Sequence, residues 1–163
     1  MAVADYPLGR LLTVRRLREE SARSAVSAAE ERCHDARKLL EACQVELARY
    51  RAWRLEEAQR RYDAVMGAAL GPGDVADFRA GLTGLDVGEQ ERAAAVQQAQ
   101  EALNAREQEL AAARVAALKA RKDTAKIDMH RDIWSAEARA ALEHWEELEL
   151  EEFARPVRHN DEG

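Results

Sequence analysis

The sequence has few residues that break helices and few that fill a wide core. Its 163 residues include three prolines, eight glycines and two cysteines, and aromatic residues make up 5%. Small apolar side chains contribute little to a core, since each buried carbon adds only about 0.8 kcal/mol. A chain that is also 34% charged, with regularly spaced apolar residues, is typical of a coiled coil or long helices.

Several functional classes find no support. The net charge of −6 argues against nucleic-acid binding, which needs a cationic surface. No apolar run has membrane-spanning length, and the start of the chain lacks the apolar segment of a signal peptide, so we expect a cytoplasmic protein with no direct membrane insertion. Cys33 and Cys43 lie on one expected helix, too far apart for a disulfide, and we expect both to be inert core residues.

The residues of catalysis are also missing. There is no Gly-rich loop followed by Lys and Ser or Thr, and a two-helix protein offers no water-excluding pocket. The histidines form no ligand cluster with each other or with the cysteines. The sequence therefore predicts no catalytic residues, no metal and no cofactor.

What is present is an apolar repeat from Val75 to Leu148. Positions alternately three and four residues apart are mostly apolar over about ten heptads, and no proline interrupts them. Such a repeat keeps one apolar seam facing a partner along a helix of roughly 110–120 Å, which predicts a rod. Its members include Leu85, Ala99, Leu103, Leu110 and Thr124, and an earlier seam includes Ala29, Cys33, Leu40, Leu47 and Tyr50.

The fold predicted is all-α: one long, rod-shaped, antiparallel two-helix coiled-coil hairpin. The first helix is expected at about 8–69, the turn at 70–73, the second helix at about 74–154 and a frayed tail at 155–163. The Gly-Pro-Gly run in the turn favours a hairpin, which we expect to be a monomer in isolation, over a long dimeric coiled coil, because the turn lets one chain satisfy its own seam.

The start of the second helix carries two further predictions. Asp74 is expected to be the N-cap, with Asp77 in the first turn favouring the helix dipole. Gly81, Gly84 and Gly88 each weaken the helix by about 1 kcal/mol relative to alanine, so they threaten its continuity.

Folding the chain at the turn sets a register in which the numbers of paired residues sum to about 143–144. Basic segments of both helices then meet near the termini and form a cationic collar. One interpretation is a solvated charged face, partly offset by neighbouring acids, and the other is a docking surface for an acidic protein. The collar consists of Arg10, Arg15, Arg16, Arg18 and Arg23 with Lys119, Arg121, Lys122, Lys126 and Arg131.

The same register leaves the second helix longer than the first by some 15–20 residues. This overhang, residues 138–154, carries an apolar stripe that includes Trp145 and Leu148, among many glutamates. An apolar stripe without an intramolecular partner predicts an interface. The alternative is that Tyr6, Pro7 and Leu8 extend far enough to cover it.

Three segments resemble the YscO-type proteins of bacterial type III secretion, relatives of the flagellar FliJ stalk. They are the opening Tyr6–Glu19, the central run Tyr50-Arg-Ala-Trp-Arg-Leu-Glu-Glu57 and the ending Glu146-Glu-Leu-Glu-Leu-Glu-Glu-Phe153. The resemblance implies a central stalk that docks into the hexameric secretion ATPase and links it to the cytoplasmic domain of the export gate at the inner membrane. It also implies an association with secretion chaperones.

On this resemblance, the ATPase-facing end combines cations with the overhang, and Tyr50, Trp53 and Arg54 are a mid-stalk contact for gate or chaperone. The rival hypothesis is a general coiled-coil adaptor or an export-chaperone-binding protein without an ATPase partner. The residues expected at the ATPase-facing end are Arg10, Arg15, Arg16, Arg18, Lys122, Lys126, Trp145 and Leu148.

Overall fold

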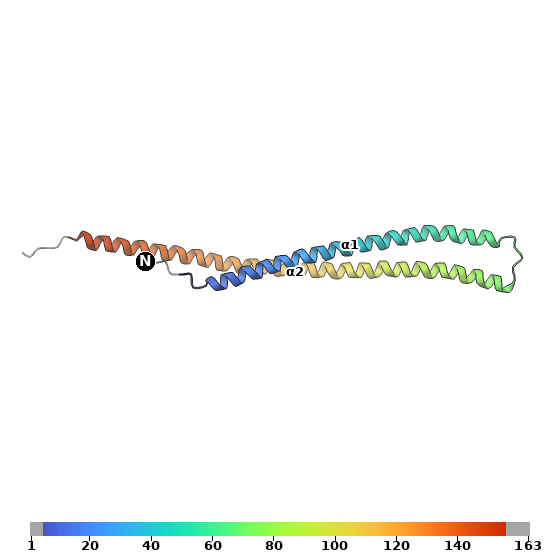
Figure 1. Cartoon of the computed structure of the whole chain (residues 1–163), viewed down its shortest axis with the longest axis horizontal. Coiled ribbons are helices and arrows are strands. Elements are labelled where there is room, and N and C mark those ends of the chain that lie inside the picture. The colour runs from blue at the N-terminus through green and yellow to red at the C-terminus, as the bar shows by residue number, and fades with distance from the viewer. Residues whose placement is uncertain (1–4, 156–163) are drawn as a thin grey trace, which may run out of the picture. The chain divides into compact units, whose positions relative to one another are not determined.

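The structure, a computed structural model, describes residues 5–155 and consists of two long helices joined by a loop (Figure 1). Helix α1 spans Gly9–Val65 and α2 spans Pro72–Ala154. The all-α hairpin is therefore confirmed. Residues 156–163 of the predicted tail lie outside the described part.

The predicted end of the first helix was wrong by four residues. Helix α1 ends at Val65 and not at Ala69, because Gly67 adopts a left-handed conformation with φ of 79°. A glycine in this conformation commonly terminates a helix, since it has no Cβ to clash. The Met66 amide still donates to the Tyr62 carbonyl at 3.0 Å, and the loop then runs from Met66 to Gly71.

The predicted N-cap of the second helix was also wrong. Helix α2 begins at Pro72, whose fixed φ suits the first helical position and whose missing N–H costs no hydrogen bond there. The Asp74 carboxylate accepts a hydrogen bond from the Gly71 amide at 2.9 Å. Asp74 therefore satisfies the amide of the capping residue from the third helical position.

Helix α2 is continuous through Gly81, Gly84 and Gly88. Two of these glycines make room for side chains of α1. A Cβ at Gly88 would overlap the Tyr50 hydroxyl, and one at Gly81 would lie 2.6 Å from an Arg61 nitrogen, whereas Gly84 has nothing within 4 Å. The close approach of α1 therefore explains Gly81 and Gly88, and it does not explain Gly84.

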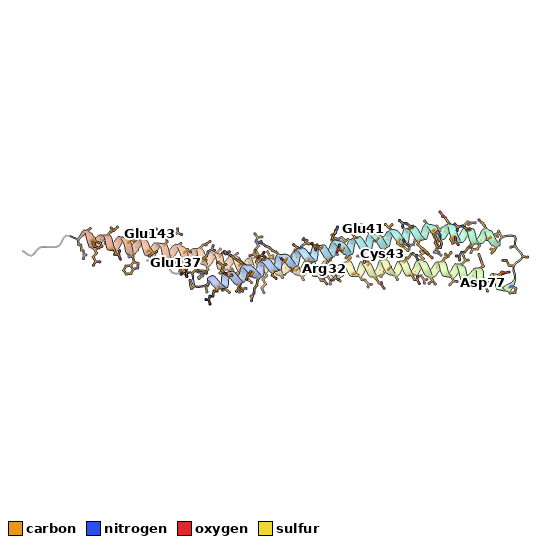
Figure 2. All side chains as sticks on the ribbon, viewed as in Figure 1. Arg32, Glu41, Cys43, Asp77, Glu137 and Glu143 are labelled. Atoms are coloured by element: carbon orange, nitrogen blue, oxygen red, sulfur yellow. The ribbon has the colours of Figure 1, made fainter. Side chains whose placement is uncertain are left out.

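The chain divides into two units, which we name by their ends. The turn-side unit comprises residues 25–114, and the terminal unit comprises residues 5–24 and 115–155 of the described chain. In the turn-side unit the seam holds two buried clusters, one around Cys33 and Leu110 and the other around Leu40 and Leu103. Figure 2 shows Cys43 toward α2 and Glu41 on the outer side of α1, as the seam requires.

The register differs slightly from the prediction. The residue numbers of ion-paired side chains sum to between 138, for Arg15 with Asp123, and 144, for Arg37 with Glu107. The predicted sum of 143–144 is the upper end of this range. The observed sums are lower because α1 ends four residues earlier than expected and α2 begins two residues earlier than expected.

Candidate protein-binding site

The terminal unit brings cations from both helices together, but it uses them in two ways. Arg15 binds Asp123 at 3.2 Å and Arg16 binds Asp128 at 3.0 Å, so these two arginines join α1 to α2. Another set makes no ion pair with any residue of 5–155 and is exposed to solvent. This set is Arg10, Arg18, Lys119, Arg121, Lys122 and Lys126.

The seam of the terminal unit is polar where Arg15 crosses it. Thr124 is buried, and its hydroxyl donates to the Ala120 carbonyl at 3.0 Å and lies 3.3 Å from the Arg15 carbonyl. The Arg15 Nε is buried without a hydrogen-bond partner among residues 5–155. The two helices associate weakly where the seam contains a hydroxyl and a guanidinium in place of leucine. The cost of burying these polar groups offsets the free energy gained by burying apolar ones.

Beside this seam lies a shallow groove of about 250 Å³ with a cationic lining. Arg15, Arg18 and Lys119 line it together with Asp123 and two alanines. Asp123 neutralises Arg15 only, so the groove keeps positive groups facing solvent. This arrangement suits an acidic protein surface.

The overhang is present in the structure. Every residue from Glu143 to Arg155 is exposed, although α2 remains helical to Ala154. Trp145 is 62% exposed and Phe153 is 88% exposed. Figure 2 shows Glu137 and Glu143 on the part of α2 that continues past the start of α1. A shallow groove of about 340 Å³ on the overhang is lined by Trp145, Leu148, Glu151, Glu152 and Arg155.

Tyr6 covers only the beginning of this region. Its hydroxyl is hydrogen-bonded to His130 Nδ1 at 2.7 Å, and its ring lies 5.5 Å from that of Trp134, centroid to centroid. Trp134 lies roughly 16 Å before Trp145 along the helix axis. Tyr6 therefore anchors the start of α1 and leaves Trp145 and Leu148 uncovered by it.

The three mid-stalk residues lie in the turn-side unit and are engaged to different degrees. Tyr50 is half-buried, donates its hydroxyl hydrogen bond to the Leu85 carbonyl at 3.0 Å, and carries the Arg92 guanidinium 3.9 Å above its ring. Arg54 binds both Asp86 and Glu89 of α2. Trp53 is 43% exposed.

Glu89 receives two arginines from α1. The Arg51 guanidinium donates to it at 2.9 Å, and this hydrogen bond, together with that from Arg54, holds the pKa of the Glu89 carboxyl below its usual range despite partial desolvation. Arg54 and Tyr50 are therefore structural contacts between the helices. Trp53 is the mid-stalk candidate that retains a large accessible side chain.

Sequence reasoning missed the Tyr50–Gly88 contact and the buried Leu12, which is 5% exposed. The predicted register gave no signal for this contact, because it places Tyr50 opposite residues 93–94, whereas the numbers of Tyr50 and Gly88 sum to 138. Leu12 had only a weak signal, because the polar Arg15 and Glu19 that follow it conceal the repeat.

Within residues 5–155, no group of three or more His, Cys, Asp or Glu side chains is arranged to hold a metal ion. Over the same residues, neither helix has an apolar stretch that could cross a bilayer.

Comparison with known proteins gives a consistent result. The family model described as "Type III secretion protein YscO" matches residues 8–156. The chain is similar to the crystal structure of the type III secretion protein YscO from Vibrio parahaemolyticus, with 27% identity, a TM-score of 0.83 and coverage of 90% of this chain and 92% of that one. It shares its fold with a putative YscO homologue from Chlamydia trachomatis, with 20% identity, a TM-score of 0.75 and 92% of each chain covered. No curated protein matches.

Proposed function

Because the chain belongs to the YscO family of type III secretion proteins, we propose that it is the non-enzymatic central stalk of the secretion apparatus. In this proposal the terminal unit docks into the hexameric secretion ATPase, and the protein links that ATPase to the export gate at the inner membrane. The observation that carries the proposal is the overhang, where α2 continues with every residue from Glu143 to Arg155 exposed.

Two surfaces of the terminal unit support docking there. The exposed cations Arg10, Arg18, Lys122 and Lys126 suit an acidic rim, and the apolar groups of Trp145 and Leu148 suit a pocket in the partner. Large aromatic side chains that become buried dominate the energy of many interfaces, while rim charges mainly set specificity and association rate.

The mechanism is mechanical and electrostatic. Helix α2 has 83 residues and is continuous through Gly81–Gly88, and in this proposal it carries the displacement from one partner to the other. Binding of the terminal unit stabilises the ATPase hexamer. The stalk then passes nucleotide-driven conformational changes of the hexamer to the gate, and it performs no chemistry.

Within the mid-stalk set, the contact with gate or chaperone centres on Trp53. Its neighbours Tyr50 and Arg54 fix the backbone beneath it through Leu85, Asp86 and Glu89. We expect Trp53→Ala to reduce capture of the gate's cytoplasmic domain while leaving ATPase stimulation unchanged, as measured by pull-down and by hydrolysis assay.

The test of the stalk is stimulation of ATP hydrolysis by the cognate secretion ATPase. Wild-type protein should stimulate hydrolysis. Arg10→Glu combined with Arg18→Glu should raise the concentration for half-maximal stimulation about tenfold or more, because both charges are exposed at the docking surface.

Lys38→Glu combined with Arg49→Glu is the matched control. It makes the same change in net charge at two exposed residues of the turn-side unit that form no ion pair within the described chain. This control should stimulate normally. Absence of stimulation by the wild type would favour the adaptor or chaperone-binding protein without an ATPase partner.

A further inference from the structure

The seam of α2 continues into the overhang after α1 has ended. Thr124, where α1 still packs, is 5% exposed, whereas the later seam residues Trp145 and Leu148 are 62% and 42% exposed. Trp145 follows Thr124 by whole heptads, so it lies on the same face of the helix. Every residue from Glu143 to Arg155 is exposed, so nothing within residues 5–155 takes the place that α1 has along the earlier seam.

The groove on the overhang has the arrangement of a hole in a coiled coil. Four of the residues that line it are spaced i, i+3, i+4 and i+7, and Trp145 lies one turn before them. On a helix surface, residues so spaced are neighbours, and in a two-stranded coil they receive one side chain of the facing helix. The groove therefore fits a side chain of a second helix. The four residues are Leu148, Glu151, Glu152 and Arg155.

The charge around this groove is of one sign. Residues 143–154 include six glutamates and no lysine or arginine, and none of these glutamates forms an ion pair within residues 5–155. In the heptad that contains Trp145 and Leu148, Glu149 and Glu151 flank the seam, which is where charges select the partner of a coiled coil. Acids at these positions favour a basic helix and repel a second overhang, which carries the same acids.

We propose that the overhang binds a basic amphipathic helix of a partner protein, which continues the two-stranded coil past the start of α1. The apolar face of this helix covers Trp145 and Leu148. Lysine or arginine residues beside that face meet Glu149 and Glu151. A lysine or arginine also fits the groove itself, because its methylene stem packs on Trp145 while its charged end reaches Glu152.

The inference deepens the proposed docking of the terminal unit, and it rests on the proposed function for the identity of the protein that supplies the helix. Binding of a basic helix does not itself require the ATPase. The collar and the overhang are opposite in charge, so a partner that engages both presents an acidic surface to the first and a basic helix to the second.

Two synthetic helical peptides of about 20 residues, roughly 30 Å long, serve as probes. Both have leucine at the seam positions, and the residues beside the seam are lysine in one peptide and glutamate in the other. Each labelled peptide is titrated with the full chain and followed by fluorescence anisotropy. The wild type should bind the lysine peptide at least about tenfold more tightly than the glutamate peptide. Trp145→Ala combined with Leu148→Ala should weaken binding of the lysine peptide about tenfold or more.

A charge reversal tests the recognition. Glu151→Lys combined with Glu152→Lys should reverse the preference, so that the variant binds the glutamate peptide more tightly. Glu41→Lys combined with Glu56→Lys is the matched control, since it makes the same change in net charge at two exposed residues of the turn-side unit that form no ion pair within the described chain. This control should keep the wild-type preference, and circular dichroism should show equal helical content in all variants.

Failure of this inference and failure of the proposed function give different results. A chain that stimulates the ATPase but binds neither peptide, or that binds the lysine peptide equally well after W145A/L148A, would overturn the basic helix and leave the stalk. A chain that binds the lysine peptide as expected but does not stimulate the ATPase would support the basic helix and reject the ATPase as its source. Self-association of the chain alone, seen by sedimentation and lost in W145A/L148A, would overturn the inference and assign the overhang to a second copy.

Discussion

The two units are built from the same pair of helices but differ in how completely each satisfies itself. The turn-side unit has seven ion pairs between α1 and α2, and the terminal unit has two, within the described chain. The turn-side unit has eight buried seam residues, whereas the terminal unit has Leu12 and Thr124. The terminal unit therefore satisfies less of its own surface within the described chain, and it is the unit that we propose as the docking surface.

The largest contrast should appear when one leucine is truncated in each unit. Leu103→Ala removes a side chain that is 7% exposed and packs with Leu40 and Ala99, so we expect a loss of about 2–3 kcal/mol in the free energy of unfolding. Leu118→Ala, at 53% exposure, should change it by less than about 0.5 kcal/mol. Urea unfolding followed by circular dichroism measures both. Equal losses in the free energy of unfolding would mean that burial in the seam does not make Leu103 more important for stability than Leu118.

The second contrast lies within the turn-side unit and tests its close helix contact. Gly88→Ala should destabilise by about 1 kcal/mol net, because displacing Tyr50 costs more than the gain in helix propensity. Gly84→Ala has open space and should stabilise by about 0.5–1 kcal/mol. Thermal unfolding of the two variants gives the signs. A stabilised Gly88→Ala would show that Tyr50 does not pack against this glycine.

A smaller effect is expected where the terminal seam is polar. Thr124→Val replaces a buried hydroxyl by a methyl group, and its two acceptors are carbonyls of helical residues, so no buried donor loses its partner. We expect about 0.5–1 kcal/mol of added stability. Slower hydrogen exchange of amides near residue 124, with unchanged exchange near Leu103, would locate the gain in the terminal unit. Slower exchange in both units would indicate that they unfold together.

The smallest effect concerns acid. The folded-state pKa of Glu89 is lowered by Arg51 and Arg54, so Glu89 stabilises the fold above its unfolded pKa, near 4.5, and this contribution is lost as pH falls through the lower folded value. Glu89→Gln should therefore make stability less steeply dependent on pH below about 4.5. Urea unfolding at a series of acidic pH values checks this slope. An unchanged slope of the free energy of unfolding against pH would show that the ionised Glu89 carboxylate does not stabilise the turn-side unit.

Much of the fold was readable from the sequence because a coiled-coil seam is a local pattern. Ala29, Cys33, Leu40 and Leu103 all fall on predicted seam positions and are buried. The helix ends were less readable. The Gly-Pro-Gly run led to a predicted turn at residues 70–73, whereas α1 in fact ends just before the single Gly67.

The candidate site was only partly predictable, since contacts between the helices decide which of its cations are ion-paired. The collar was identified from composition, but only the three-dimensional register shows that Arg15 and Arg16 bind Asp123 and Asp128, while Arg18 and Lys122 form no such pair with any residue from 5 to 155. The overhang was predictable because it follows from helix lengths alone.

The most direct test of the division between the units is hydrogen–deuterium exchange of the full chain with and without its cognate secretion ATPase. If the terminal unit is the docking surface, the ATPase should slow exchange in residues 9–24 and 119–154 and leave residues 30–50 and 95–110 unchanged. Protection confined to the turn-side unit, or absent from both units with the ATPase in excess, would contradict the account.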